Sequence, residues 1–202
     1  MRTINLPDNR PLGLTGLEGM SDAELAAFCR ENPALRIERD TNGQLLLMPP
    51  THSDSGRINA RINLEIGLWW RQSPRSGEFF DSNTGFTLPD GSMRSPDASW
   101  VSAEKWNALT DDQRQNQFAP VCPEFVIELK SGSDVLPDLQ RKMTDVWLAN
   151  GTQLAFLLDA KAEISYIYRA GQPEPETVVG FDQELSGEPV LPGFRLDLRL
   201  IR

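Results

Sequence analysis

Charged side chains interrupt an otherwise apolar stretch of the chain. Residues 123–132 read PEFVIELKSG, and the run from Phe125 to Leu129 has the composition of a buried strand. Because successive side chains of a strand point to opposite faces, Glu128 and Lys130 would share one face with Val126. Phe125, Ile127 and Leu129 would take the other, fully apolar face. Charges rarely enter a sheet interior unless they are paired or bind a ligand. The stretch is therefore either an ion pair at a sheet rim or part of a site.

A second apolar strand, SPDASWV, begins with Asp97. Proline belongs at the start or edge of a strand, so Pro96 places Asp97 near an end of the sheet. Aspartate and glutamate without a cluster of His or Cys favour a hard, oxygen-seeking cation, Mg²⁺ or Mn²⁺. Such an ion polarises a phosphate, and a nearby lysine such as Lys130 orients water or stabilises developing charge. Asp97, Glu128 and Lys130 together predict phosphodiester hydrolysis.

Three further carboxylates have roles that the sequence leaves open. Glu38 lies in a short strand and is either an exposed hairpin charge or a neighbour of the site. Glu65 falls on the apolar face of a helix, where it needs a partner: a metal ion, a lysine or nearby Arg61. Glu124 precedes the central strand, and its position fixes no role.

The combination of SPD at 95–97 and ELK at 128–130 resembles the PD-(D/E)XK nuclease superfamily. Within that superfamily, the chain from Met20 to Asp159 is similar to the Uma-type family of restriction endonucleases, many of which are known only as a domain of unknown function. The segments that carry the resemblance are RIERDTNGQLLLMPPT, RSPDASWV, PEFVIELKSGSD and LQRKMTDVWLANGTQLAFLLD.

This resemblance implies a role for each of five residues. Asp97 and Glu128 would hold the metal ion, and Lys130 would assist the attacking water. Glu38, at the usual acidic position of the opening hairpin, would be an accessory residue near the metal, and Lys142 would be a second accessory residue.

The chain departs from its relatives at two positions. Many relatives have a serine where this chain has Lys130, and the complete E-x-K motif favours a competent site. Many also carry a histidine where this chain has Ser55, so His52 is interpreted as a loop residue.

Local patterns predict the elements that position these residues. Ser21 and Glu24 have the spacing of a capping box at the start of a short helix, and Asn42-Gly43 predicts a hairpin turn. Apolar residues at helical spacing predict helices at 57–70 and 136–151. Strands are expected in GEFFDS, TGFTLP, SPDASWV, EFVIELKS, TQLAFLLDA and AEISYIYRA. This order predicts an α/β (α+β) fold with a central mixed sheet flanked by helices, and the resemblance implies a restriction-endonuclease-like core.

The 202 residues suit one domain, 1–202, with residues 1–19 as an extended N-terminal arm. A net charge of -9 argues against a surface made for nonspecific binding to nucleic acid or membrane. Cys29 and Cys122 fit no zinc spacing and are expected to be reduced thiols. The sequence offers neither a signal peptide nor an apolar run that could span a bilayer, so we expect a cytoplasmic protein.

The leading interpretation is an endonuclease that uses Mg²⁺ or Mn²⁺ and acts on DNA. One alternative is a nuclease-fold binding or defence-associated module that cuts nothing. Another is a structural acidic protein whose E-x-K motif is a buried ion pair. Because the net charge disfavours tight DNA binding by a monomer, we expect a homodimer or a protein partner.

Overall fold

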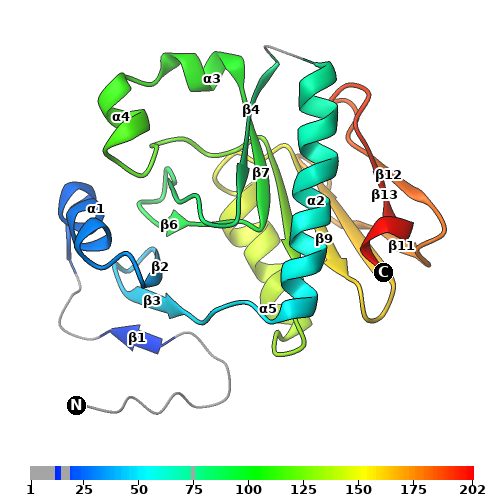
Figure 1. Ribbon diagram of the computed structural model, residues 1–202, viewed down its shortest axis with the longest axis horizontal. Helices are drawn as coiled ribbons and strands as arrows, with labels where there is room; N and C mark the ends of the chain where they lie inside the picture. The colour runs from blue at the N-terminus through cyan, green and yellow to red at the C-terminus, as the bar shows by residue number, and fades with distance from the viewer. Residues whose placement is uncertain (1–11, 15–18, 74–75) are drawn as a thin grey trace.

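A six-stranded, a five-stranded and a two-stranded sheet form the framework of the protein (Figure 1). The computed structural model describes residues 12–14, 19–73 and 76–202, the side chains of residues 12–14 excepted. The arm predicted for residues 1–19 therefore lies mostly outside the described residues. Within that arm, β1 (Leu12–Leu14) pairs with strand β3 (Leu45–Met48).

The six-stranded sheet has the mixed character that the sequence predicts. Its strand order is β11-β10-β9-β8-β7-β4, and β8 pairs antiparallel with β7 and parallel with β9. Since parallel neighbours cannot be joined by a tight turn, a helical crossover links β8 to β9. The strands are β4 (Gly77–Asp81), β7 (Ala98–Ser102), β8 (Phe125–Leu129), β9 (Leu154–Asp159), β10 (Ile164–Arg169) and β11 (Glu176–Val179).

The crossover changes its hydrogen-bond pattern half-way along. It begins as α5 (Leu136–Arg141) and continues as the π-helical segment η1 (Lys142–Leu148). The amide of Ala149 donates to the carbonyl of Thr144, five residues earlier, over 3.0 Å. An α-helix would make this bond to the fourth residue, so η1 has more residues in each turn. The sequence pattern correctly predicts a helix here, but not this local widening.

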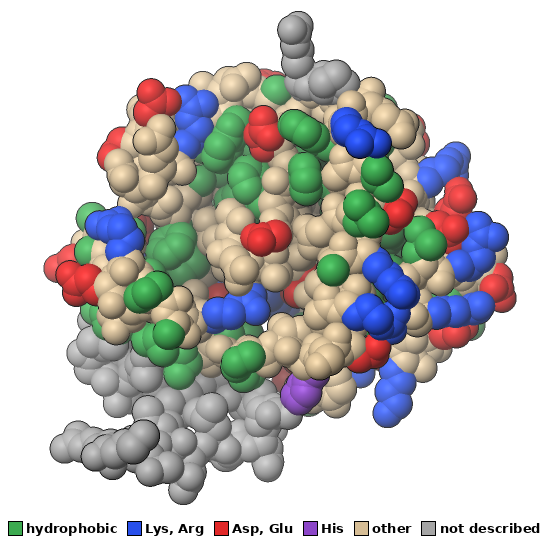
Figure 2. Space-filling model, in the orientation of Figure 1, with side chains coloured by type: hydrophobic (Ala, Val, Ile, Leu, Met, Phe, Trp, Pro, Cys, Tyr) green, Lys and Arg blue, Asp and Glu red, His purple; other side chains and the backbone are tan. Residues whose placement is uncertain are grey.

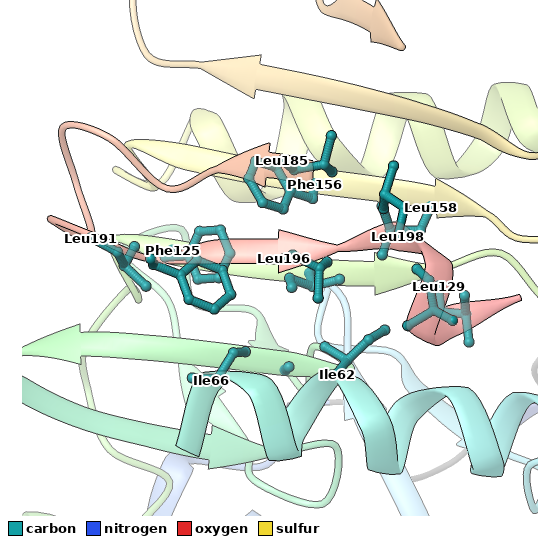
Figure 3. Close-up of a cluster of buried hydrophobic side chains, with 14 of the residues drawn as sticks. Ile62, Ile66, Phe125, Leu129, Phe156, Leu158, Leu185, Leu191, Leu196 and Leu198 are labelled. Carbon is teal, nitrogen blue, oxygen red and sulfur yellow. The ribbon is translucent and has the colours of Figure 1, made fainter. Parts of the chain in front are cut away.

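Each face of β8 packs on a different core. On one face, Ile62 of the long helix α2 (Ser53–Gln72) lies in the same cluster as Phe125 (Figure 3). On the other face, Val126 packs with Trp147 of η1. Helices on both faces are what the sequence predicts, although α2 begins at Ser53, before the predicted start at residue 57.

The five-stranded sheet contains the predicted hairpin. Its strands β2 (Arg36–Arg39) and β3 are joined by a turn at Gly43, whose φ of +80° glycine adopts without strain. The strand order is β1-β3-β2-β6-β5, so β5 (Phe86–Thr87) and β6 (Met93–Arg94), which follow α2 in the chain, complete the sheet. Helix α1 (Asp22–Glu31) has the predicted capping box and packs against this sheet through Leu25.

Short elements complete the chain. Between β7 and β8 lie α3 (Ala103–Ala108) and α4 (Asp111–Gln115). After β11 come β12 (Glu184–Ser186), β13 (Arg195–Asp197) and the 3₁₀-helix η2 (Leu198–Ile201). Their residues Leu185, Leu196 and Leu198 join the core beside α2 (Figure 3). Nowhere in the described part of the chain is a helix both long and apolar enough to cross a bilayer.

Candidate active site

Asp97 and Glu128 come from neighbouring strands of the six-stranded sheet. Asp97 directly precedes β7, Glu128 lies in β8, and the two strands pair with Ala98 opposite Ile127. The amide of Leu129 donates to Oδ2 of Asp97 over 2.8 Å, and the side-chain amide of Asn59, on α2, donates to Oδ1 over 2.8 Å. Burial nevertheless raises the pKa of Asp97 above its ordinary value.

The carboxylate of Glu128 is buried and surrounded by charge. Its Oε1 accepts a hydrogen bond from Nε1 of Trp147 over 2.8 Å and lies 2.7 Å from Nζ of Lys142. Burial raises the pKa of Glu128 to about 7; the ammonium of Lys142 opposes the shift, and the negative charges of Asp97 and Glu38 add to it. The ionised form of Glu128 is therefore costly even beside Lys142, and a further cation would lower that cost.

The lysine beside these carboxylates is Lys142, from the start of η1. Burial alone would lower the pKa of Lys142, but the carboxylates of Glu128 and Glu38 raise it above its ordinary value. Lys130, two residues after Glu128 in sequence, instead has its Nζ 3.3 Å from Oδ2 of Asp159. Lys130 follows the end of β8, and its ammonium is directed to Asp159, the last residue of the neighbouring strand β9.

Glu38 connects the five-stranded sheet to the crossover helix at the site. Its Oε2 lies 3.0 Å from Nη1 of Arg94, its Oε1 accepts from the amide of Ser95 over 3.1 Å, and Nζ of Lys142 lies 3.8 Å away. Burial alone would raise the pKa of Glu38, but Lys142 and Arg94 hold it below its ordinary value. Glu38 is a buried anion between two cations, and not an exposed hairpin charge.

The side chains of Glu38, Asp97, Glu128 and Lys142 line one cleft of about 530 Å³. Carboxylates outnumber permanent positive charges in its lining. A cleft with this balance attracts cations. On the face in Figure 2, acidic and basic side chains are intermixed, and the described residues form no continuous basic surface there. The acidic and basic lining residues are Arg36, Glu38, His52, Asp97, Glu128, Asp134 and Lys142.

Two of the three carboxylates whose roles the sequence leaves open, Glu124 and Glu65, lie outside the cleft. Glu124 accepts from the hydroxyl of Ser102 over 2.6 Å and lies 3.5 Å from Nζ of Lys105, so it is committed to the start of α3. Glu65 is half-buried on α2, and neither it nor Lys130 belongs to the described lining of the cleft. The cleft therefore brings together Glu38, Asp97, Glu128 and Lys142.

Sequence reasoning missed three neighbours of the site: Asn59, Arg94 and Trp147. Asn59 is polar but 8% exposed, next to the predicted apolar face of α2, and that unusual position was a usable signal. The ring of Trp147 packs in the core, as expected for a tryptophan in an amphipathic helix, but its indole N–H has a polar partner. Arg94 carried no local signal, because its partner Glu38 is far away in sequence.

The donor set fits a Mg²⁺ or Mn²⁺ ion. In the described ranges, no three His, Cys, Asp or Glu side chains are grouped so as to enclose a metal ion. Mg²⁺ does not require such a cage, since one or two carboxylates usually hold it while water and substrate phosphate complete its shell. Asp97 and Glu128 are such a pair, and a cation between them would relieve the repulsion that contributes to the raised pKa of Glu128.

The fold is that of a solved protein from Anabaena variabilis, entitled "a putative nuclease belonging to DUF820". The two structures have a TM-score of 0.67 and 18% sequence identity, covering 82% of this chain and 88% of that one. At this identity the likeness establishes a shared nuclease fold. The Uma2 family model, described as "Putative restriction endonuclease", matches residues 22–199. The chain belongs to the Uma2 family, as the sequence motifs predict. No curated protein matched the chain.

Proposed function

We propose that the protein is a nuclease that hydrolyses phosphodiester bonds of DNA with the help of Mg²⁺ or Mn²⁺. The observation that carries the proposal is the convergence of Asp97, Glu128 and Lys142 in one cleft. Membership of the Uma2 family and the nuclease fold support the same class of reaction.

In this proposal Asp97 and Glu128 hold the cation, which when bound polarises the phosphate and makes water a better nucleophile. Lys142 remains protonated at neutral pH, because its carboxylate neighbours raise its pKa. Its ammonium is therefore available to stabilise negative charge that develops on the phosphate oxygens. Asn59 and the amide of Leu129 fix both oxygens of Asp97 before substrate arrives.

Two residues receive roles that differ from those implied by the resemblance. We assign the function expected of Lys130 to Lys142, because the ammonium of Lys130 is paired with Asp159. Glu38 was expected near the metal ion; we propose that it mainly holds Lys142 in place, because two cations, Arg94 and Lys142, already neutralise its charge.

We also propose that the substrate is DNA, that the protein forms a homodimer and that it is cytoplasmic. A net charge of -9 repels a polyanion. A bound cation would offset part of this repulsion, and a second copy of the chain would compensate only by adding the contacts of a second cleft. Light scattering of the purified protein, with and without a DNA oligonucleotide, tests the homodimer directly.

The decisive experiment measures cleavage of single-stranded and duplex DNA, and of RNA, with Mg²⁺ and Mn²⁺. We expect Asp97→Asn and Glu128→Gln to lower the rate at least about 100-fold, because each removes a charge that holds the cation. Glu124→Gln is the matched control, since Glu124 borders the same strand but lies outside the lining of the cleft.

Metal-dependent cleavage that survives both Asp97→Asn and Glu128→Gln would overturn the assignment of the site. Binding of DNA by the wild-type protein without any cleavage would favour the second candidate, a non-catalytic binding module.

A further inference from the structure

The indole of Trp147 makes a polar contact in the middle of a hydrophobic core. The side chain is completely buried, yet its Nε1–H donates to Oε1 of Glu128 over 2.8 Å. An indole has one donor and no acceptor, and it does not titrate. In the hydrogen bond between the two side chains, Trp147 is therefore the donor and Glu128 the acceptor at every pH at which the bond forms.

The π-helical register brings Trp147 and Lys142 to the same oxygen. In an α-helix, residues five apart differ by about 140° in direction and face different neighbours. In η1 the bonds span five residues, as from the amide of Ala149 to the carbonyl of Thr144 over 3.0 Å. A turn of this width returns to nearly the same face after five residues. Nζ of Lys142 also lies 5.8 Å from the centre of the Trp147 ring.

The two donors leave the carboxylate of Glu128 with one committed and one available oxygen. Oε1 is taken by Trp147 and Lys142. Within the described part of the chain, no group donates a hydrogen bond to Oε2, although Glu128 lines the cleft. A carboxylate fixed in this way presents one oxygen to a ligand in a single orientation.

We propose that Trp147 is a positioning residue that orients Glu128 so that Oε2 faces a divalent cation in the cleft. This inference rests on the proposed function, because it takes Glu128 as a ligand of the cation. Partners behind a metal ligand fix its orientation, and their loss weakens metal binding even though they never touch the ion.

Trp100 provides a matched control in the same sheet. It is 5% exposed and lies in the core on the other face, and its Nε1 has no hydrogen-bond partner among the described residues. Trp147→Phe and Trp100→Phe therefore remove the same atoms from a buried site. Only the first change removes a donor from Glu128.

The test is a Mn²⁺ titration of the full chain, with free Mn²⁺ followed by electron paramagnetic resonance. We expect Trp147→Phe to raise the dissociation constant about 10- to 100-fold. Trp100→Phe should leave it at the wild-type value. An unchanged constant in Trp147→Phe, or equal losses in both variants, would overturn the inference. Absence of Mn²⁺ binding by the wild-type protein would instead overturn the proposed function, and the inference with it.

A second measurement needs no core substitution. In a ¹H–¹⁵N spectrum of the wild-type protein, addition of Mg²⁺ should shift the indole signal of Trp147 and leave that of Trp100 in place. Selective ¹⁵N labelling of tryptophan restricts the indole region to the five tryptophans of the chain. If the Trp147 signal does not move at Mg²⁺ concentrations that displace bound Mn²⁺ from the wild-type protein, the inference is overturned.

Discussion

Nζ of Lys142 lies 2.7 Å from Oε1 of Glu128, whereas the lysine of the E-x-K motif, Lys130, is paired with Asp159. The two lysines can therefore be separated by experiment. We expect Lys142→Met to lower the cleavage rate about 100-fold or more, because it removes a preorganised positive charge from the cleft. Lys130→Met should have a much smaller effect. Rates at saturating Mg²⁺ are to be compared for the two variants, with circular dichroism as a check on folding. A larger loss in Lys130→Met would return the catalytic role to the motif lysine.

Glu128 gives the metal-free protein a pH-dependent stability. Burial raises the pKa of its carboxyl from 4.5 to about 7. Between these values the folded protein binds more protons than the unfolded chain, so the free energy of unfolding falls as the pH rises. Glu128→Gln removes this contribution.

Urea denaturation in the presence of a chelator, at about pH 5 and about pH 8, measures the effect. We expect the free energy of unfolding to fall by less between these pH values in Glu128→Gln than in the wild-type protein. An equal fall in both proteins would show that the pKa of Glu128 is not raised.

Glu38 should be more important for stability than its place in a hairpin suggests. Glu38→Gln leaves Arg94 and Lys142 as buried cations without their shared anion, and breaking such an arrangement costs about 3 kcal/mol. Urea denaturation at neutral pH checks this figure. Asp182→Asn is the control, because its pair with Arg202 is on the surface and should contribute little.

Arg36 is expected to contact the phosphate backbone. It lines the cleft, and of its guanidinium only Nη2 donates to a described partner, the carbonyl of Ser82. Arg36→Gln should reduce the slope of log affinity against log salt concentration by about one, the contribution of one phosphate contact. Fluorescence anisotropy with labelled DNA, and Ca²⁺ in place of Mg²⁺, measures the slope. Arg199→Gln, outside the cleft, should leave it unchanged.

The sequence predicted well where the signal was local. The capping box of α1, the turn at Gly43 and the apolar strand β8 each depend on residues close together in the chain, and all three are confirmed. The SPD and ELK motifs predict that Asp97 and Glu128 share a site, and in the structure Asp97 directly precedes β7, the strand that pairs with β8. Whether residues 1–202 form one domain stays a prediction.

The remaining features depend on distant partners or on helix pitch. The hairpin lies in the five-stranded sheet, apart from the six-stranded one. This arrangement depends on β6, which follows α2 in the chain and pairs with β2. Lys142 and Trp147 reach one oxygen of Glu128 only because η1 is wider than an α-helix, and no spacing rule for α-helices would place them together.

The short connection between β6 and β7 has a consequence for motion. It consists of Ser95, Pro96 and Asp97. Its first residue is bonded to Glu38 of the five-stranded sheet, and its last is bonded to Leu129 of the six-stranded sheet. Because the segment is short and is hydrogen-bonded at both ends, it cannot lengthen to absorb a movement of either sheet. Residues of both sheets line the cleft together with helices and loops, so a movement of one sheet relative to the other would displace Asp97.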